Sequence, residues 1–222
     1  SDCLVGSEMC IRDRVLSLKL LDMKIKEMLS LKKSLDILRK TDALLEGHFI
    51  LSSGLHSSKY IQCAKLMSFP YMAQSICLSL AKKIKKKIKK IDLILSPAMG
   101  GIIIGYEIGK ILKKETIFCE RVNGTFSLRR GFRIKKGSRV LIVEDVITTG
   151  KSSKECFSLV KKNKGIISGL ACIIDRSNRK KLKLKNKIIS HIKINVPTYH
   201  KSKLPKDLKL IPISRPGSRF IK

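Results

Sequence analysis

The segment Arg139-Val-Leu-Ile-Val-Glu-Asp-Val-Ile-Thr-Thr-Gly-Lys-Ser152 decides how the surrounding chain can fold. It opens with Val140 to Val143, an unbroken aliphatic run of the length of a strand buried on both faces of a parallel sheet. Two acidic residues, Glu144 and Asp145, follow at once, and a helix is predicted from Ser153 to Val160. The segment therefore predicts a strand, a loop and a helix that belong to an α/β sheet.

The loop between this strand and this helix has the features of a phosphate site. Ligands of open α/β sheets bind at the carboxyl ends of the strands. The hydroxyl groups of Thr148 and Thr149, free backbone N–H groups and a helix N-terminus can hold a phosphate, and Gly150 can adopt a positive φ. Two neighbouring acids can accept hydrogen bonds from a diol, so the segment fits a sugar phosphate.

Two simpler interpretations of the segment are weaker. Gly150-Lys151-Ser152 looks like the end of a P-loop, but that motif needs a glycine five residues before Gly150, where this chain has Asp145. A pair of acids at a strand end is also commonly just a solvated strand terminus. The full order of strand, Glu-Asp, apolar pair and Thr-Thr-Gly is much more specific than either feature alone.

The complete segment resembles the signature of type I phosphoribosyltransferases, which bind phosphoribosyl diphosphate (PRPP). The resemblance implies an α/β fold of the type I phosphoribosyltransferase kind, with a central, mostly parallel sheet flanked by helices and a small hood built from N-terminal and C-terminal segments. It implies that Glu144 and Asp145 are catalytic and hold the ribose hydroxyls. It also implies Mg²⁺ as a cofactor, held mainly through PRPP near Asp145 with no direct protein ligand. The PRPP residues implied here are Glu144, Asp145, Val146, Ile147, Thr148, Thr149, Gly150, Lys151 and Ser152.

Composition indicates one soluble domain. The chain has 222 residues and no Pro-, Gly- or Ser-rich linker, so we expect a single domain over residues 15–222. Hydrophobic residues make up 43% of the chain, yet no segment approaches the eighteen or more apolar residues of a membrane span. Seven cysteines are scattered without the spacing of a zinc site or a disulfide framework. We expect a cytoplasmic protein with reduced thiols and no membrane partner.

The formal net charge of +31, from 48 Lys+Arg against 17 Asp+Glu, has two interpretations. A basic chain can have a nucleic-acid partner. Here the excess is spread along the chain and comes mainly from lysine together with abundant isoleucine, which favours a bias of AT-rich coding sequence. We therefore do not expect nucleic acid as a partner, although the charge would attract small polyanionic substrates over a range that salt shortens.

Residues 1–14 do not match the sequence that follows them. They contain no lysine and begin with serine rather than methionine. The string resembles the translation of a sequencing adapter, so we expect a non-native leader and leave it out of the fold prediction. A signal peptide is not indicated, because Asp2 precedes only a very short apolar stretch.

A helix followed by a hairpin is predicted next. Gly47 is a plausible residue to end the helix, and residues 47–62 read as two short strands around a Ser53-Gly54 turn. His48 and His56 are expected to be ordinary hairpin residues rather than catalytic bases. The apolar positions that recur at helical spacing are Leu31, Leu35, Leu38 and Leu45.

This hairpin resembles the GxFxLxSGxxSxxY motif of orotate phosphoribosyltransferases, where the hairpin covers the pyrimidine. The resemblance implies that Phe49 and Ser53 contact orotate. One branch of that family has a lysine immediately before the Ser-Gly pair, where this chain has Ser52, so a base contact through that lysine is absent or supplied elsewhere. The matching residues are Phe49, Ser53, Gly54, Ser57 and Tyr60.

A second phosphate loop is predicted after residues 71–88, an amphipathic helix whose lysine-rich end is expected to be a solvated face. Ile91 to Leu95 reads as a buried strand, and Ser96 to Ile102 as a glycine-bearing loop into a helix that ends near Leu112. In the family that the chain resembles, this loop contacts pyrophosphate. PRPP contacts through backbone amides are implied for Gly100 and Gly101.

The stretch from Glu120 to Gly131, after a predicted strand at residues 116–119, is polar and flanked by glycine. Its lack of apolar periodicity predicts a lid, from Val122 onward, that is disordered when empty and ordered over PRPP. By position it resembles the mobile catalytic loop of orotate phosphoribosyltransferases, although many members carry lysines and a histidine there. The resemblance implies a homodimer in which the loop reaches the partner's site. The implied roles are PRPP binding for Arg121 and catalysis for Arg129 and Arg130.

A further predicted strand, Gly169 to Asp175, ends in an Asp-Arg pair. An arginine can hold a carboxylate through two hydrogen bonds, which a lysine does less well. The orotate-binding arginine of the family stands 28 residues after the first signature threonine, as Arg176 does after Thr148. The resemblance therefore implies that Thr148 and Arg176 contact orotate. A structural ion pair between Arg176 and Asp175 is the alternative.

The resemblance covers roughly residues 31–219 and implies an orotate phosphoribosyltransferase. Such an enzyme makes orotidine 5′-monophosphate and diphosphate from orotate and PRPP, a step of UMP biosynthesis. A purine phosphoribosyltransferase would share the signature but gives no reason for the hairpin or the Asp-Arg pair. A non-catalytic RNA-binding regulator on the same fold is favoured only by the net charge.

Overall fold

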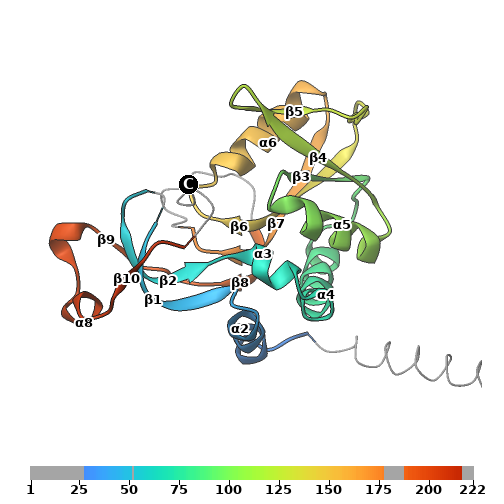
Figure 1. The fold of residues 1–222 in the computed structure, drawn as a ribbon. Coiled ribbons are helices and arrows are strands. Elements are labelled where there is room, and N and C mark those ends of the chain that lie inside the picture. The colour runs from blue at the N-terminus through green and yellow to red at the C-terminus, as the bar shows by residue number, and fades with distance from the viewer. Residues whose placement is uncertain (1–27, 52, 178–187, 217–222) are drawn as a thin grey trace, which may run out of the picture.

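The computed structural model describes residues 28–51, 53–177 and 188–216, and the expected leader at residues 1–14 lies outside them. The described chain forms a sheet of six strands and a sheet of four strands (Figure 1). The helices are α2 (Leu31–Lys40), α3 (Cys63–Met67), α4 (Pro70–Lys87), α5 (Gly101–Leu112), α6 (Lys151–Lys162), η1 (Lys201–Lys203) and α8 (Lys206–Lys209). The strands are β1 (Leu44–Ile50), β2 (His56–Ile61), β3 (Leu93–Pro97), β4 (Glu115–Val122), β5 (Thr125–Leu128), β6 (Arg139–Ile147), β7 (Ile166–Asp175), β8 (Ile188–Lys193), β9 (Thr198–Tyr199) and β10 (Ile213–Ser214).

The larger sheet confirms the predicted, mostly parallel architecture. Its strand order is β5-β4-β3-β6-β7-β8, and within it only the pairing of β5 with β4 is antiparallel. The chain continues from β3 to β4 on one side and from β6 to β7 on the other, so the order reverses between the neighbouring strands β3 and β6. A reversal of this kind opens a crevice at the carboxyl ends of the two strands, where ligands bind.

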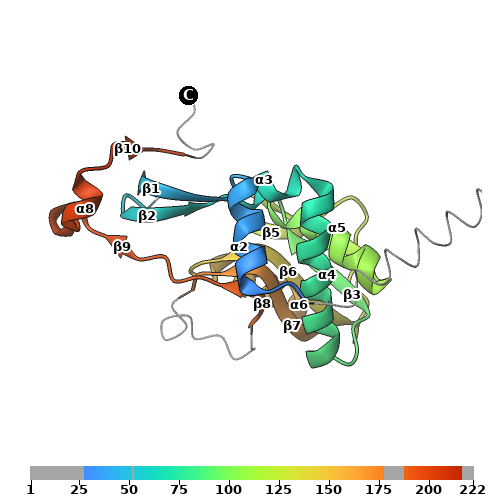
Figure 2. The same ribbon diagram turned by 90° about the horizontal axis from the view of Figure 1, so that it is seen from below.

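The middle of strand β6, from Val140 to Val143, is aliphatic because both of its faces are buried there. Leu141 and Val143 pack in a core with α4 and α5, whereas Val140 and Ile142 pack in a second core with α6. Figure 2 shows α2, α4 and α5 together on one face of the sheet. The sheet is therefore covered by helices on both faces, as the continuous apolar run predicts.

Both ends of the described chain build the smaller sheet, which we call the hood. Its strand order is β10-β1-β2-β9. β1 and β2 form the predicted hairpin, and Gly54 in its turn has a φ of +77°. The tail returns through β9, η1 and α8 to β10, which pairs with β1 (Figures 1 and 2). The predicted hood of N-terminal and C-terminal segments is confirmed.

Helix α2 ends at Lys40, well before the predicted end near Gly47. The hydroxyl group of Thr41 donates to a backbone carbonyl one turn earlier (2.9 Å), and Asp42 turns the chain with a φ of +53°. Gly47 lies inside β1, at an irregularity in its pairing with β2. The prediction is wrong because Leu45, which fits the helical spacing, belongs to the following strand.

Residues 115–128 form a β-hairpin rather than leading into a disordered lid. β4 continues to Val122, and β5 pairs antiparallel with it. Asn123 and Gly124 both have positive φ, 50° and 80°, which is the turn that Asn-Gly favours in two-residue hairpins. Phe126 then anchors β5 in the core beside α6. The expectation that the segment from Val122 lacks regular structure is wrong, because the Asn-Gly pair is a hairpin signal and not only a loop signal. Its closure over PRPP stays a prediction.

Candidate active site

The two predicted phosphate loops meet where the strand order reverses. One loop joins β3 to α5 and carries Gly100 and Gly101, and the other joins β6 to α6. A Cβ atom on Gly100 would lie 2.5 Å from Asp145 Oδ2, and one on Gly101 would lie 3.3 Å from the carbonyl oxygen of Val143. A side chain at position 100 would displace the carboxylate, so the glycines let the first loop touch the end of β6.

The loop between β6 and α6 presents donors for an anion. Thr148 and Thr149 are exposed, and Gly150 begins α6 with a φ of +69° and without a side-chain cap. The N–H group of Lys151 makes only a long contact of 3.4 Å with Thr149 Oγ1. Hydroxyl groups, available N–H groups and the positive end of the helix dipole together form a phosphate site.

Glu144 and Asp145 are adjacent but lie in different environments. Glu144 is buried beside α6, where Ser153 Oγ donates a hydrogen bond to its Oε1. Burial raises the pKa of Glu144 to about 7, and the Ser153 hydrogen bond opposes that shift. Asp145 is half-buried next to Gly100, and burial raises its pKa as well. Asp145 is thus the more accessible carboxyl group, whereas Glu144 supports it from within the protein.

Thr148 and Arg176, the predicted orotate residues, lie at the ends of neighbouring strands. The backbone N–H of Arg176 donates to Ile147 O (3.0 Å), which holds it beside the start of the anion loop. The carboxylate of Asp175 accepts hydrogen bonds from Ser177 N (3.0 Å) and Ser177 Oγ (2.5 Å). Within the described residues Arg176 forms no ion pair, so the alternative of a structural pair with Asp175 is not what this structure contains.

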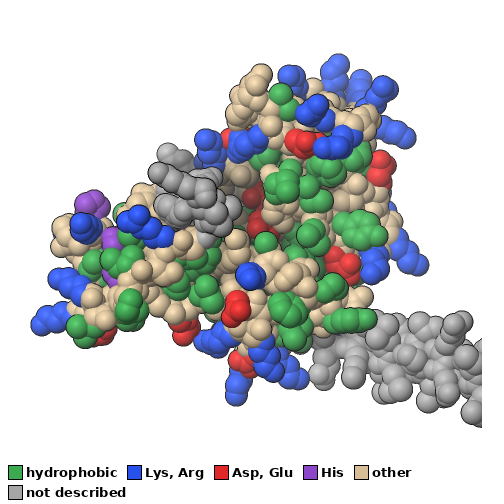
Figure 3. Space-filling view, viewed as in Figure 1, with side chains coloured by type: hydrophobic (Ala, Val, Ile, Leu, Met, Phe, Trp, Pro, Cys, Tyr) green, Lys and Arg blue, Asp and Glu red, His purple; other side chains and the backbone are tan. Residues whose placement is uncertain are grey.

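The hood reaches the same region through its hairpin. Burial lowers the pKa of Arg176 and the charge of Tyr60 of β2 opposes that shift, so the two side chains lie within electrostatic range of each other. Phe49 is buried, and its ring centroid lies 5.8 Å from that of Tyr60. Ser53 instead lies exposed in the hairpin turn. Figure 3 shows a recess between the hood and the larger sheet, with acidic side chains inside it.

Arg121 is held by contacts within the β4–β5 hairpin and with α6. Its Nη1 donates to Gly124 O (2.7 Å), and its Nη2 lies 2.6 Å from Glu155 Oε2. The guanidinium carbon lies 4.2 Å from the ring centroid of Phe126. These contacts give Arg121 a structural role, and the sequence alone did not indicate it.

Arg129 and Arg130 follow the hairpin but differ in their surroundings. Arg130 Nε donates to Glu120 Oε1 (2.7 Å), and this hydrogen bond holds the pKa of Glu120 below its ordinary value. Arg129 is exposed and has no ion-pair partner among the described residues. Of the two predicted catalytic arginines, Arg129 is therefore the one that no described ion pair holds.

Two residues near the site were not singled out as functional from the sequence. Ser153 donates to Glu144 across nine residues, and Tyr60 stands beside Arg176 although more than a hundred residues separate them in the chain. The position of Ser153 in the first turn of a predicted helix could have indicated a contact with the preceding acids. Tyr60 carried no local signal beyond its place in the hairpin motif.

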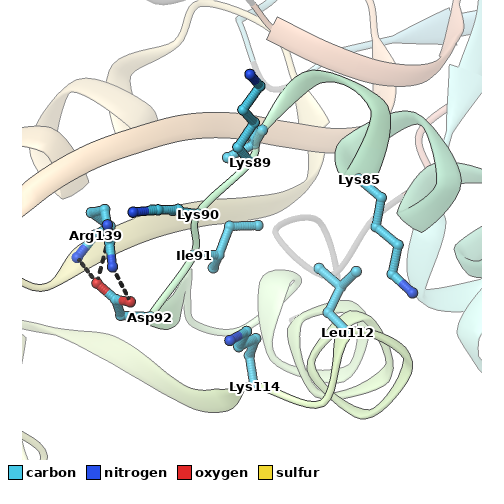
Figure 4. A pocket seen from close by; sticks show the side chains of 9 residues that line it. Lys85, Lys89, Lys90, Ile91, Asp92, Leu112, Lys114 and Arg139 are labelled. Atoms are coloured by element: carbon cyan, nitrogen blue, oxygen red, sulfur yellow. Dashed lines mark hydrogen bonds and ion pairs between the residues drawn. The ribbon is translucent and has the colours of Figure 1, made fainter.

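Two cavities lie away from the crevice. One has a volume of about 350 Å³ and lies at the amino ends of β3 and β6, where Arg139 and Asp92 form a bidentate ion pair of 2.9 Å per contact (Figure 4). In Figure 4, Lys85 and Lys89 point in opposite directions, so their amines do not converge on one ligand atom. The other cavity, of about 590 Å³, lies between β5 and α6. Neither contains the predicted site residues.

Two negative findings apply to the described part of the chain alone. No group of three or more His, Cys, Asp or Glu side chains there is arranged to hold a metal ion. In the same residues, every helix is too short or too polar to span a bilayer.

Comparison with known proteins identifies the class. A family model of the phosphoribosyl transferase domain matches residues 72–203. The structure of an orotate phosphoribosyltransferase from Aeropyrum pernix is similar with a TM-score of 0.63 and 23% identity, covering 72% of this chain and 92% of that one. An adenine phosphoribosyltransferase from Thermoanaerobacter pseudethanolicus has a TM-score of 0.54 and 22% identity, covering 61% and 88%. At such identities these two structures show the fold alone.

Sequence relatives narrow the class. An orotate phosphoribosyltransferase of Parvibaculum lavamentivorans is 47% identical over 191 residues, which cover 86% of this chain and 98% of the relative. Another, from Caldicellulosiruptor saccharolyticus, is 45% identical and covers 85% of this chain and 97% of the relative. The chain therefore belongs to the orotate phosphoribosyltransferase family, and the predicted fold class and family are confirmed.

Proposed function

We propose that this protein transfers the 5-phosphoribosyl group of PRPP to orotate and releases orotidine 5′-monophosphate and diphosphate. The position of Arg176 is the observation that favours orotate as the base. Its half-buried guanidinium group has no carboxylate partner among the described residues and is held at the edge of the anion loop. The carboxylate of such a base could accept two charge-assisted hydrogen bonds from this guanidinium group. The relatives named above carry the same assignment.

The reacting centre would be placed by the two loops and by Asp145. The loop at residues 148–152 supplies hydroxyl and N–H donors to the 5-phosphate, and Gly100 and Gly101 bring backbone amides toward the diphosphate. Asp145 beside Gly100 can accept hydrogen bonds from the ribose hydroxyls. The protein then contributes positioning and electrostatic stabilisation of an oxocarbenium-like centre rather than a covalent nucleophile.

Mg²⁺ fits this arrangement as a partner of PRPP. The carboxylate of Asp145 is an oxygen ligand of the kind that Mg²⁺ accepts, while the diphosphate of PRPP would supply further oxygens. Glu144 fits less well, because burial raises its pKa to about 7 and one of its oxygens already accepts from Ser153. When bound, the ion would neutralise charge on the leaving diphosphate.

A homodimer is part of the same proposal. Ile103 and Tyr106 of α5 are 57% and 67% exposed, and Met99, in the loop just before this helix, is 83% exposed. Phe69 and Tyr71, at the start of the adjacent α4, are also exposed. Figure 3 shows hydrophobic side chains gathered in this part of the molecule. A contiguous apolar patch of this kind marks an interface, and a second copy of the chain would cover it.

A cytoplasmic location is supported by the thiols. Cys63, Cys77, Cys119, Cys156 and Cys172 are buried and free, and Cys119 Sγ and Cys156 Sγ share a 3.7 Å hydrogen bond without a disulfide. Free thiols so close together suit a reducing compartment.

The test is a substrate panel. Purified protein with PRPP and Mg²⁺ should consume orotate, which is followed by its ultraviolet absorbance, and should leave adenine, guanine and hypoxanthine unchanged. Asp145→Asn is the inactive control, expected to lose roughly 100-fold or more in kcat while it stays folded. Turnover of a purine base without turnover of orotate would establish the purine alternative instead.

A further inference from the structure

Two buried histidines lie in the middle of the hood. His48 of β1 is 2% exposed and His56 of β2 is 4% exposed, and their ring centroids are 4.9 Å apart. His48 Nε2 lies 2.6 Å from His56 Nδ1, and His48 Nδ1 lies 3.2 Å from the backbone oxygen of Ile211. The pair therefore links the β1–β2 hairpin to the segment between α8 and β10.

The backbone acceptor fixes the direction of hydrogen bonding. The oxygen of Ile211 can only accept, so His48 Nδ1 carries a hydrogen, and Nε2 of the neutral ring must accept. His56 Nδ1 consequently donates to His48 Nε2. A single proton added to the pair need not break the link, because His56 could then carry its hydrogen on Nε2 and accept at Nδ1. It would, however, place a positive charge on two rings that are almost fully buried, which is costly, so the closed hood favours the neutral pair.

The same two residues stand where the tail strands join the hairpin. β10 pairs with β1 through His48 and Ile213, and β9 pairs with β2 through His56 and Tyr199. β9 and β10 contain only two residues each, so the backbone pairing is short. The histidine link therefore joins the tail to the hairpin together with the hydrogen bond from Ser57 Oγ to Pro197 O (3.0 Å) and the burial of Leu208 of α8.

The hairpin also carries the side chains that stand beside the proposed orotate site. Phe49 directly follows His48 and its ring packs on Tyr60, whose charge influences Arg176. On the basis of the function proposed above, we propose that His48 and His56 form a clasp whose neutral state positions the hood over orotate, so that mild acid weakens orotate binding and leaves PRPP binding unchanged. They are positioning residues, because they act through Phe49 and Tyr60.

The surroundings of His56 determine the sign of the pH effect. Burial and then His48, Lys201 and His200 lower its pKa, and among the described residues no carboxylate offsets them. With the hood open, His56 would return to a pKa near ~6.5. The open hood therefore binds a proton more readily than the closed hood. The closed state is fully favoured above about pH 6.5 and loses stability as the pH falls below it.

Two variants distinguish the effect of protonating His56 from the effect of losing its hydrogen bond to His48. In His56→Asn the amide nitrogen can take the place of Nδ1 and donate to His48 without titrating. His56→Leu keeps a similar apolar volume and removes the donor. The KM for orotate, the KM for PRPP and kcat are measured at about pH 8 and about pH 6. Because the phosphate of PRPP titrates near ~6 as well, each comparison is made between variants at one pH.

At about pH 6, the orotate KM of the wild-type protein should be roughly five- to tenfold higher than that of His56→Asn. The PRPP KM and kcat of the two proteins should agree within about twofold at this pH. His56→Asn should match the wild type at the higher pH, and His56→Leu should have a raised orotate KM at both. Identical pH profiles in wild type and His56→Asn would overturn the clasp. So would an equal rise of both KM values in His56→Leu, and if that variant does not fold, the His56→Asn comparison still decides.

A second measurement needs no substrate and so separates the clasp from the proposed activity. Hydrogen exchange of the backbone amides in residues 198–214 should show lower protection factors at about pH 6 than at about pH 8 in the wild type, and unchanged factors in His56→Asn. Protection that is independent of pH in the wild type would refute the clasp, whatever base the enzyme uses.

Discussion

Glu144 is a carboxylic acid in a place that disfavours its charge. Burial raises its pKa from an ordinary 4.5 to about 7. The folded state therefore holds this proton more tightly than the unfolded state, and stability contributed by the group falls as the pH rises from 4.5 through about 7. Glu144→Gln should raise the free energy of unfolding by roughly 1–3 kcal/mol at about pH 8 and change it little at about pH 5, as measured by urea denaturation.

Asp92 is the matched control for this prediction. Hydrogen bonds from Arg139 lower its pKa to about 2, so its charged form is the one that the folded state favours. Asp92→Asn should give no gain in stability at either pH. A gain of equal size for Glu144→Gln at both pH values would contradict burial of the charge as its cause.

Arg176 should determine affinity for orotate without affecting PRPP. In Arg176→Lys a point charge replaces a planar fork, so attraction is kept while the paired hydrogen bonds are lost. The expected result is a rise of roughly tenfold or more in the orotate KM, with the PRPP KM within about twofold. Steady-state kinetics with each substrate varied in turn measures both. Equal losses for the two substrates would mean that Arg176 holds the strand ends together rather than binding the base.

Residues of the site could be found from the sequence where the signal is local. Glu144, Asp145 and Gly150 fall within one segment, and Gly150 caps α6 as predicted. The strand does not stop before the acids, however, because β6 continues through Glu144 and Asp145 to Ile147. The different environments of the two acids could not be foreseen, because the pKa of Glu144 depends on burial beside α6. Nor could the electrostatic influence of Tyr60 on Arg176, which depends on how the hood sits over the sheet.

At the level of elements, predictions succeeded where a single periodicity dominates. The buried runs in β3, β6 and β7 and the amphipathic α4 are unambiguous. The errors fall where two patterns compete. Leu45 fits both a helical repeat and a strand, and tertiary pairing with Tyr60 places it in β1. Asn123-Gly124 fits both a flexible loop and a tight hairpin, and burial of Phe126 selects the hairpin.

The β4–β5 hairpin changes which arginine is expected to act on the diphosphate. Arg130 is paired with Glu120, whereas Arg129 is exposed and has no ion-pair partner among the described residues. Arg129→Ala should lower kcat by roughly tenfold or more, because a cation beside the leaving group stabilises charge that develops in the transition state. Arg130→Ala, measured in the same assay, should have a smaller effect. The reverse order would show that Arg130 leaves Glu120 when substrates bind.

The whole molecule is electrically polarised along its helices. The anion loops lie at the N-termini of α5 and α6, where the helix dipole is positive. Basic residues occupy the last turn of α2, α4, α5 and α6, where the dipole is negative. Part of the net charge of +31 therefore lies at favourable positions at helix ends.

The exposed apolar face of α5 is the expected interface of the proposed homodimer. Tyr106→Glu should convert the proposed dimer to a monomer, because an unpaired carboxylate would be buried in the interface. Sedimentation equilibrium measures the mass, and Ile166→Glu, at an exposed apolar position at the start of β7, is the control that should remain dimeric. If the hairpin serves the partner's site, kcat should fall as the dimer dissociates. A monomeric Tyr106→Glu with full activity would show that each subunit closes its own site, and an unchanged dimer would place the interface on another face.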